Sequence, residues 1–158
     1  MKKPRRAREP SDEPGEGFDS RVRRRDTDRP ERAADPTKVL VVDDDALARS
    51  EVVCAALDAG YEALAVADPQ LALAICVKER PGVLLCSAEL VGMPAMKLVR
   101  LVLLALGDEA PSHMIYTSGN PRHVASRDVE ATFAKPVDPE RLRMALDLAI
   151  EKRRRDAQ

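Results

Sequence analysis

KVLVVDDD, from Lys38 to Asp45, is the stretch of the sequence that decides the fold. Its first five residues form an apolar, β-branched run that is typical of a buried strand, and three acidic residues end that run. The residues that follow, 46–59, have helical spacing in Leu47, Ser50, Cys54 and Leu57, and Gly60 ends the helix. One strand is therefore followed directly by one helix.

The same alternation continues to the end of the chain. Further strands are predicted at residues 61–67, 83–86, 112–117 and 131–134, and further helices at 71–79, at 94–106 and from Asp138 onward. Asp68 is expected to cap the second helix, with Pro69 at its first position. Because strands alternate with helices and crossovers are right-handed, we expect an α/β fold whose parallel sheet is covered by helices on both faces.

The composition divides the chain into two unequal parts. The 158 residues are 44% hydrophobic and 34% charged with a net charge of -1, which disfavours a uniformly basic nucleic-acid binder and an acidic disordered chain. Residues 1–36 mix clustered charges with Pro and Gly and contain almost no large apolar side chains. We therefore predict a disordered mixed-charge arm over 1–36 and one folded domain over 37–155.

Several other classes are disfavoured by residue types. No apolar run is long enough to span a bilayer, and the N-terminus has Arg and Pro where a signal peptide needs an apolar stretch, so no membrane association and a cytoplasmic location are expected. Aromatic residues make up 3%, so no nucleic-acid partner is expected for the folded domain. The cysteines lack C-x-x-C spacing and no histidine completes a metal cluster, so Cys54, Cys76 and Cys86 are interpreted as buried free thiols.

Polar residues follow several of the predicted strands. In an open parallel sheet the functional site lies at the carboxyl ends of the strands. The candidate site residues are therefore the acidic pocket Asp43, Asp44 and Asp45, residues 87–89 with Ser87 and Glu89, the pair Thr117 and Ser118, and Lys135.

This series of motifs resembles the receiver domain of bacterial two-component response regulators, from about Lys38 to about Lys152. The similarity is carried by the acidic pocket, Gly60-Tyr61, Gly92-Met93, Thr117-Ser118 and Lys135-Pro136. The resemblance implies a flavodoxin-like receiver fold with strand order 2-1-3-4-5 and a cis-proline at Pro136. It also implies transfer of a phosphoryl group from a phospho-histidine to an aspartate at the end of strand three, with Mg²⁺ bound. A lysine and a hydroxyl residue after strand four then contact the phosphoryl group.

The sequence departs from that pattern at the acceptor position. Matching residues 81–86 and Gly92-Met93 without gaps places Ser87 where the family has its aspartate. A serine hydroxyl must lose a proton before it can attack phosphorus, and no neighbouring histidine accepts it. Thr132 stands where the family has an aromatic switch residue, while Phe133 is expected on the opposite face of its strand, and residues 120–128 leave room for only a shortened fourth helix.

The loss of one carboxylate also weakens the implied cation site. Asp43 and Asp44 remain as ligands for a weakly held Mg²⁺, and Glu89 is a further candidate ligand. The alternative is that no cofactor is required and that the acids form a solvated loop in which one of them pairs with Lys135.

The helix at 94–106 is apolar on nearly all sides. Its core-facing residues are predicted to be Leu98, Val99, Val102 and Leu106, which leaves Leu101 and Leu104 facing outward. We interpret Leu101 and Leu104 as a surface for a partner or for self-association, against isolated exposed leucines as the alternative.

The function predicted from these observations is that of an atypical single-domain response regulator. It is a non-enzymatic, receiver-like signalling module that acts through protein contacts, with a histidine kinase or another regulator as partner, and without normal aspartyl phosphorylation. One alternative is a small phosphohydrolase of the haloacid-dehalogenase type, which would use Asp43 and Asp45 together with Thr117 and Lys135. Another alternative keeps phosphotransfer, with Ser87 or Asp45 as the acceptor.

Overall fold

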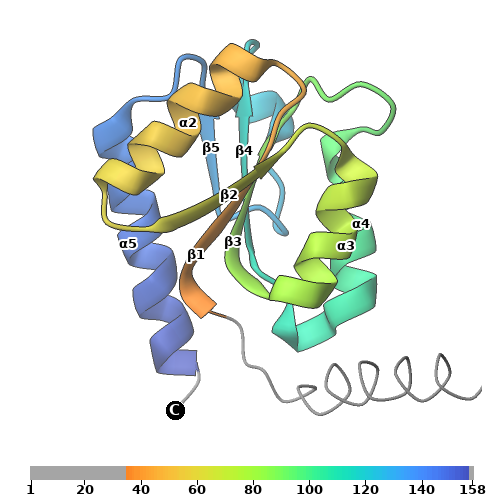
Figure 1. The fold of residues 1–158 in the computed structure, drawn as a ribbon, viewed down its shortest axis with the longest axis vertical. Coiled ribbons are helices and arrows are strands. Elements are labelled where there is room, and N and C mark those ends of the chain that lie inside the picture. The colour runs from red at the N-terminus through yellow and green to blue at the C-terminus, as the bar shows by residue number, and fades with distance from the viewer. Residues whose placement is uncertain (1–34, 157–158) are drawn as a thin grey trace, which may run out of the picture. The chain divides into compact units, whose positions relative to one another are not determined.

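The computed structural model describes residues 35–156, in which five parallel strands form one sheet (Figure 1). The strands lie in the order β2-β1-β3-β4-β5, which confirms the predicted α/β fold class and strand order. Their bounds are β1 Asp35–Val42, β2 Glu62–Val66, β3 Pro81–Ser87, β4 Ser112–Thr117 and β5 Ala131–Ala134.

Helices cover both faces of this sheet. Figure 1 shows α2 and α5 on one face and α3 and α4 on the other. The α-helices are α2 Ala46–Asp58, α3 Pro69–Glu79, α4 Ala95–Leu106 and α5 Pro139–Asp156, and the short 3₁₀ helices are η2 Gly107–Glu109 and η3 Pro121–Val124. None of the helices within residues 35–156 has the length and apolar character needed to cross a bilayer.

Two aspartates begin α2 and α3 as side-chain caps. The Oδ1 atom of Asp45 accepts hydrogen bonds from the backbone N–H groups of Leu47 at 3.1 Å and Ala48 at 3.4 Å. The corresponding oxygen of Asp68 accepts from the N–H of Gln70 at 3.0 Å, and Pro69 is the first helical residue, as predicted. These contacts pair backbone donors that a helix start otherwise leaves without partners.

The core has two layers, one on each face of the sheet. Every residue of β3 is buried, because β3 is the central strand and helices cover both of its faces. Alternate strand residues serve opposite layers: Val39, Val41, Tyr116 and Phe133 pack with α2 and α5, whereas Leu40, Val42 and Ile115 pack with α3 and α4. Thr132 and Phe133 were predicted to lie on opposite faces of their strand, and Phe133 packs in the α2–α5 layer beside Tyr116.

Helix α2 uses a different face from the one that its spacing suggested. Its buried residues are Val52, Ala55 and Ala56, while Leu47 is 70% exposed and Leu57 is 51% exposed. Cys54 is exposed as well, so the prediction of three buried thiols is wrong at this position. Apolar residues occur around the whole helix, and the small side chains of Ala55 and Ala56 let it lie close to the sheet.

The two other thiols are buried as predicted. Burial raises the pKa of both Cys76 and Cys86 to about 12, so both remain protonated and inert at neutral pH.

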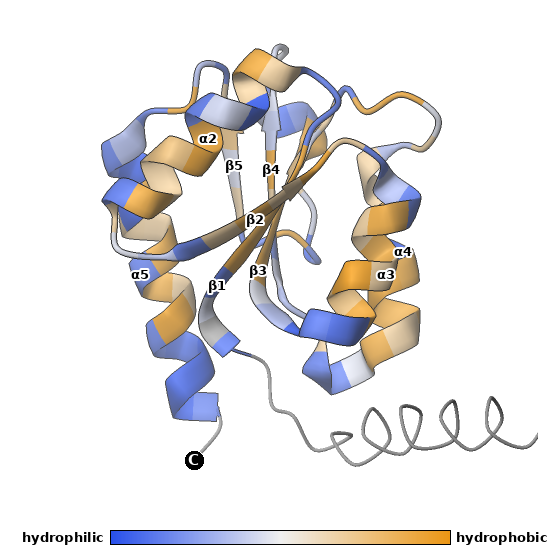
Figure 2. Cartoon of the chain, viewed as in Figure 1, coloured by the Kyte–Doolittle hydropathy of each residue, from blue (hydrophilic) through white to orange (hydrophobic). Residues whose placement is uncertain are grey.

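Helix α4 also requires a correction. Figure 2 shows its strongly hydrophobic character, and Leu98, Val99, Val102 and Leu106 are buried as predicted. Leu101, however, is only partly exposed and packs against the core, whereas Leu104 is 83% exposed. The proposed outward surface is therefore reduced to Leu104, because Leu101 packs against the core cluster on the α3–α4 side of the sheet.

The helix that forms between β4 and β5 is shorter than the one predicted over residues 120–128. Only the 3₁₀ turn η3 forms, beginning at Pro121 with Asn120 as its cap. Val124 and Val129 are the apolar residues of this segment that pack on the core, and two such contacts do not support a longer amphipathic helix.

The predicted arm over residues 1–36 lies outside the described residues except for its last two. Asp35 and Pro36 belong to β1, and the Asp35 N–H donates to the carbonyl of Arg80 at 2.9 Å. The folded part therefore begins before the predicted boundary at residue 37.

Candidate functional site

The predicted site residues gather where β1, β3, β4 and β5 end. Asp43 follows β1, Ser87 ends β3, Thr117 ends β4 and Lys135 follows β5. Because side chains alternate along each strand, Asp43, Ser87 and Lys135 lie on the α2–α5 side of the sheet. The Lys135–Pro136 peptide bond is cis, as the resemblance implies.

Ser87 lies at the centre of this group and is fully buried. Its Oγ atom accepts a hydrogen bond from Lys135 Nζ at 2.9 Å and from the Glu89 backbone N–H at 3.2 Å. Lys135 is the donor of this hydrogen bond, so it is not placed as a base toward the serine hydroxyl.

Glu89 occupies the centre of the hydrogen-bond network. One of its carboxylate oxygens accepts from Thr117 Oγ1 at 2.6 Å, and the other accepts from the Ser118 N–H at 3.0 Å and from Ser118 Oγ at 3.2 Å. Lys135 Nζ lies 3.0 Å from the same carboxylate. A single carboxylate therefore pairs with the hydroxyl residues after β4 and with the lysine after β5.

These contacts determine the charge of Glu89. Burial by itself raises the pKa of the Glu89 carboxyl, but the hydrogen bonds from Thr117, Ser118 and Lys135, with the Lys135 charge, outweigh it and lower this pKa to about 2. Glu89 is thus a stable anion at neutral pH.

The three acids of the predicted pocket have three separate roles. Asp43 is fully buried, and its two oxygens accept from the Asp45 N–H at 2.9 Å and from the Tyr116 hydroxyl at 2.7 Å. Asp44 accepts from the Val91 N–H at 2.9 Å, and Asp45 caps α2. Lys135 pairs with Glu89 and not with one of these acids, contrary to the solvated-loop interpretation.

The arrangement fits a magnesium site poorly. Within residues 35–156 no three His, Cys, Asp or Glu side chains are grouped so that they could hold a metal ion. The Glu89 carboxylate, a candidate ligand on sequence grounds, faces Thr117 and Lys135, and at the acceptor position Ser87 supplies a neutral hydroxyl. Mg²⁺ requires several hard oxygen ligands in octahedral geometry, and these residues present few carboxylate oxygens that are not already hydrogen-bonded.

Tyr116 is a site residue that the sequence reasoning missed. Its ring is buried against the α2–α5 layer, with Lys135 Nζ 5.2 Å from the ring centroid. Burial, and then the hydrogen bond to Asp43, raise the pKa of the Tyr116 hydroxyl well above its usual range, so it is a permanent donor to Asp43. Strand alternation offered the signal: Tyr116 pairs in register with Ser87.

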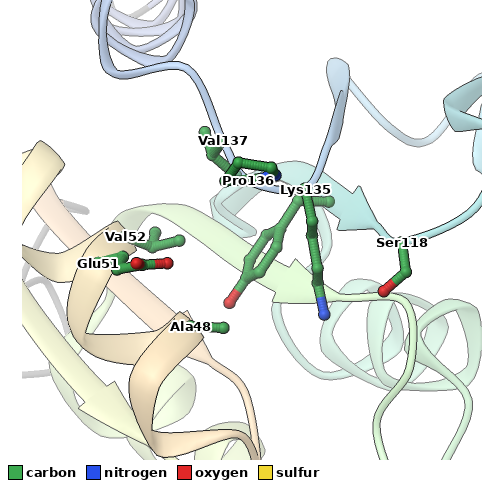
Figure 3. Close-up of a pocket in the computed structure, with 8 residues that line it drawn as sticks. Ala48, Glu51, Val52, Ser118, Lys135, Pro136 and Val137 are labelled. Atoms are coloured by element: carbon green, nitrogen blue, oxygen red, sulfur yellow. The ribbon is translucent and has the colours of Figure 1, made fainter.

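A pocket of about 290 Å³ opens beside Lys135. Figure 3 shows Lys135, Pro136 and Val137 from the segment after β5 and Ala48, Glu51 and Val52 from α2, with Ser118 beyond Lys135. Lys135 therefore has both a buried partner, Ser87, and access to this open pocket.

The low pKa of Glu89 leads to a testable dependence of stability on pH. A carboxyl group whose pKa is lower in the folded state stabilises the fold above its ordinary pKa of 4.5, and this contribution is lost as the pH falls toward 2. The Glu89 side chain is 44% exposed, so solvent screening reduces the contribution to about 1 kcal/mol. Glu89→Gln is expected to lower the free energy of unfolding by that amount at pH 7 and by little near pH 2.

Urea unfolding at several pH values measures this difference. Glu62→Gln on the edge strand β2 is the matched control and is expected to change the stability little at any pH, since Glu62 is exposed and forms no ion pair among residues 35–156. A deficit in Glu89→Gln that is the same at pH 2 and pH 7 would contradict the role given to the carboxylate charge.

Comparisons with known proteins agree with this geometry. No family model and no curated protein matches the chain. Among solved structures, the chemotaxis response regulator CheY4 of Vibrio cholerae is 27% identical, covering 74% of this chain and 98% of its own, with a TM-score of 0.62. The REC domain of AraT, a response regulator from Geobacillus stearothermophilus, is 24% identical, and the match covers 78% of this chain and 100% of that domain with a TM-score of 0.66. The signal receiver domain of a Luxo repressor protein from Vibrio parahaemolyticus is 18% identical, and the match covers 77% of this chain and 95% of that domain with a TM-score of 0.68. The described part of this chain therefore has the fold of the response regulator receiver domain.

Proposed function

We propose that this domain is a receiver-like signalling module that acts through protein contacts and does not use aspartyl phosphorylation. The observation that carries the proposal is the position of the Glu89 carboxylate, which is bonded to Thr117, Ser118 and Lys135. In the receiver family these hydroxyl and lysine groups contact the phosphoryl group. Here they already have an anionic partner that belongs to the chain itself.

The environment of Ser87 supports the same conclusion. Its hydroxyl oxygen accepts from Lys135 and from a backbone N–H, and both of these groups are hydrogen-bond donors to it. The nearby Glu89 carboxylate, with a pKa of about 2, is a very weak base. Ser87 therefore lacks the proton acceptor that a serine nucleophile requires, and phosphotransfer through Ser87 is not favoured.

The proposal also implies that this domain depends less on bound Mg²⁺ than the receiver family does. Asp44 and Asp43 remain near one another, but both accept hydrogen bonds within the fold. We therefore expect that no cofactor is required for the fold or for partner binding, and that any binding of Mg²⁺ is weak.

The buried state of Asp43 does not favour the phosphohydrolase alternative. A nucleophilic carboxylate must reach a substrate phosphorus atom, whereas Asp43 is fully buried and both of its oxygens accept hydrogen bonds from Tyr116 and Asp45. Asp45 is used as the cap of α2, which likewise does not favour it as an acceptor in phosphotransfer. We therefore propose a non-enzymatic cytoplasmic role, with a histidine kinase or another regulator as the partner.

The test is treatment of the full chain with acetyl phosphate and Mg²⁺, followed by intact mass spectrometry. We expect no gain of a phosphoryl group at neutral pH. An acid-labile phosphoryl group that maps to the acidic pocket would overturn the proposal, and one on Ser87 would transfer the phosphoacceptor role to that serine.

Self-association through Leu104 is a separate part of the proposal. This side chain is the most exposed large apolar residue of α4, and Lys97 and Arg100 on the same helix are also exposed. Leu104→Glu is expected to keep the free energy of unfolding within about 0.5 kcal/mol of the parent. It is also expected to lower the weight-average sedimentation coefficient at high protein concentration, because less of the chain self-associates. Leu71→Glu on α3 is the control, and equal sedimentation of the parent and Leu104→Glu would show that α4 is not the interface.

A further inference from the structure

The Glu89 carboxylate joins three segments that lie far apart in the sequence. Glu89 belongs to the connection between β3 and α4, whereas Thr117 and Ser118 lie at the end of β4. Its remaining donor, Lys135, follows β5, and Figure 3 shows Ser118 and Lys135 on these two neighbouring segments. A carboxylate that receives charge-assisted hydrogen bonds from two other segments restricts how those segments move relative to one another.

The turn after β4 is built on the groups that Glu89 contacts. The Thr117 hydroxyl donates to Glu89 at 2.6 Å, and the same Oγ1 atom accepts from the Gly119 N–H at 3.0 Å. Ser118 donates to the carboxylate through both its backbone N–H and its hydroxyl. The carboxylate therefore fixes the Thr117 side chain together with the direction of the backbone at Ser118 and Gly119.

The β4–β5 connection, residues 118–130, has little else to hold its first residues. Most of its residues are exposed, and its apolar side chains that pack on the core are Val124 and Val129. Its far end is held separately, by the ion pair of Glu130 with Lys152 at 3.0 Å. A segment with few buried contacts opens locally at a small cost in free energy, so the carboxylate at its start decides its arrangement.

Ser87 determines where the negative charge of this site lies. Its Oγ atom accepts from the Glu89 N–H at 3.2 Å, which orients the backbone at Glu89, and from Lys135 at 2.9 Å. A carboxylate at position 87 would repel the Glu89 charge, whereas the neutral serine hydroxyl does not. The pKa of about 2 keeps Glu89 ionised at neutral pH.

We propose that Glu89 is an internal ligand, which takes the place of an added anion and holds the start of the β4–β5 connection in one arrangement. The contact surface that this connection forms is then presented permanently, with no modification of the chain. Because Glu89 belongs to the site of the proposed function, its role as a positioning residue rests on that function.

Replacement of the carboxylate by a separate one tests this role. Glu89→Ala leaves a gap between the donors that acetate can fill, and the Glu89 side chain is 44% exposed, so the variant is expected to fold. Solvent exchange of the Ser118 and Gly119 N–H groups in the full chain is measured by NMR at pH 7. Both are expected to exchange at least about tenfold faster than in the parent. Acetate at about 0.5 M is expected to restore most of the protection, and sodium chloride at the same concentration is not.

Two further variants separate the causes. Glu89→Gln fills the same space without the charge, so it is expected to exchange faster than the parent and to show no response to acetate. Glu130→Ala removes a carboxylate from the other end of the same connection, where it pairs with Lys152. It is expected to leave exchange at Ser118 and Gly119 within about twofold of the parent, with or without acetate.

Each contrary outcome rejects the inference. Equal exchange at Ser118 in the parent and in Glu89→Ala would show that the carboxylate does not hold the turn. Equal effects of acetate and sodium chloride on Glu89→Ala would show that the site does not bind a carboxylate. The acetyl phosphate experiment on the parent tests the proposed function separately, because a labelled parent overturns that function whatever the exchange rates of the Glu89 variants are.

Discussion

Replacement of Ser87 by Asp together with Glu89 by Asn is expected to produce a protein that acetyl phosphate labels with one phosphoryl group in the presence of Mg²⁺. Ser87→Asp supplies an ionised nucleophile at the end of β3, beside Lys135. Glu89→Asn removes the carboxylate that now pairs with Thr117 and Lys135, and so releases both groups to contact the new phosphoryl group. Intact mass spectrometry, with the label removed by mild base, measures the result.

The two single variants separate the two causes. Ser87→Asp alone is expected to label at least about tenfold more slowly than the pair, because Glu89 still bonds Thr117 and Lys135 and adds a like charge beside the acceptor. Glu89→Asn alone is expected to remain unlabelled, since it has no carboxylate at the acceptor position. The pair Ser87→Asn with Glu89→Asn is the matched control of similar shape without the nucleophile.

The rates decide the role of Glu89. Equal labelling of Ser87→Asp with and without Glu89→Asn would mean that Glu89 does not occupy the phosphoryl contacts. If a folded double variant remains unlabelled, the bonds of Asp43 to Tyr116 and Asp45 would become the feature that blocks the chemistry.

Tyr116→Phe is expected to lower the free energy of unfolding by about 2 kcal/mol at pH 7. The substitution removes only the hydroxyl, which donates at 2.7 Å to a carboxylate oxygen of Asp43, and both residues are fully buried. Water does not replace the lost donor at this position, so a buried charged acceptor remains partly unsatisfied, which costs more than the hydrogen bond of a neutral pair. The midpoint of urea unfolding, with an unchanged m-value, measures the loss.

Tyr61→Phe provides the matched control, since the Tyr61 hydroxyl also donates to a carboxylate, that of Asp147 on α5. Asp147 is exposed, and water can hydrate its carboxylate when the hydroxyl is removed, so the expected cost is about 0.5 kcal/mol. A similar loss of stability in both tyrosine variants would show that burial of Asp43 is not the cause.

Much of the secondary structure could be predicted because its causes are local. The strands at 112–117 and 131–134 have the predicted bounds, and Asp68 with Pro69 begins α3 as capping chemistry requires. Strand alternation likewise predicted that Phe133 and Thr132 face opposite sides of the sheet, and the structure places Phe133 in the layer with α2 and α5. By contrast, the buried face of α2 could not be predicted, because apolar side chains surround that helix and only contact with the sheet selects Val52, Ala55 and Ala56.

The site was predictable in its residue types and not in its contacts. The sequence identified Asp43, Ser87, Thr117 and Lys135 as residues that follow strands, and parallel strands must bring these ends together. It did not show that Glu89 would turn toward Thr117 and Lys135, because the direction of a loop side chain depends on the charges brought near it by other strands. The sequence therefore predicted Glu89 only as a possible metal ligand, because the position of Lys135 relative to it was unknown.

The sequence by itself determined the order of strands and helices, the residue types at the carboxyl ends of the strands and the absence of an aspartate at position 87. These properties depend on periodicity, capping and residue identity along one segment. Only the tertiary structure decided that Tyr116 bonds to Asp43 and that Glu89 neutralises Lys135. The physical reason is that hydrogen bonds and ion pairs between distant residues depend on strand register and on burial, which arise when the whole sheet packs against its helices.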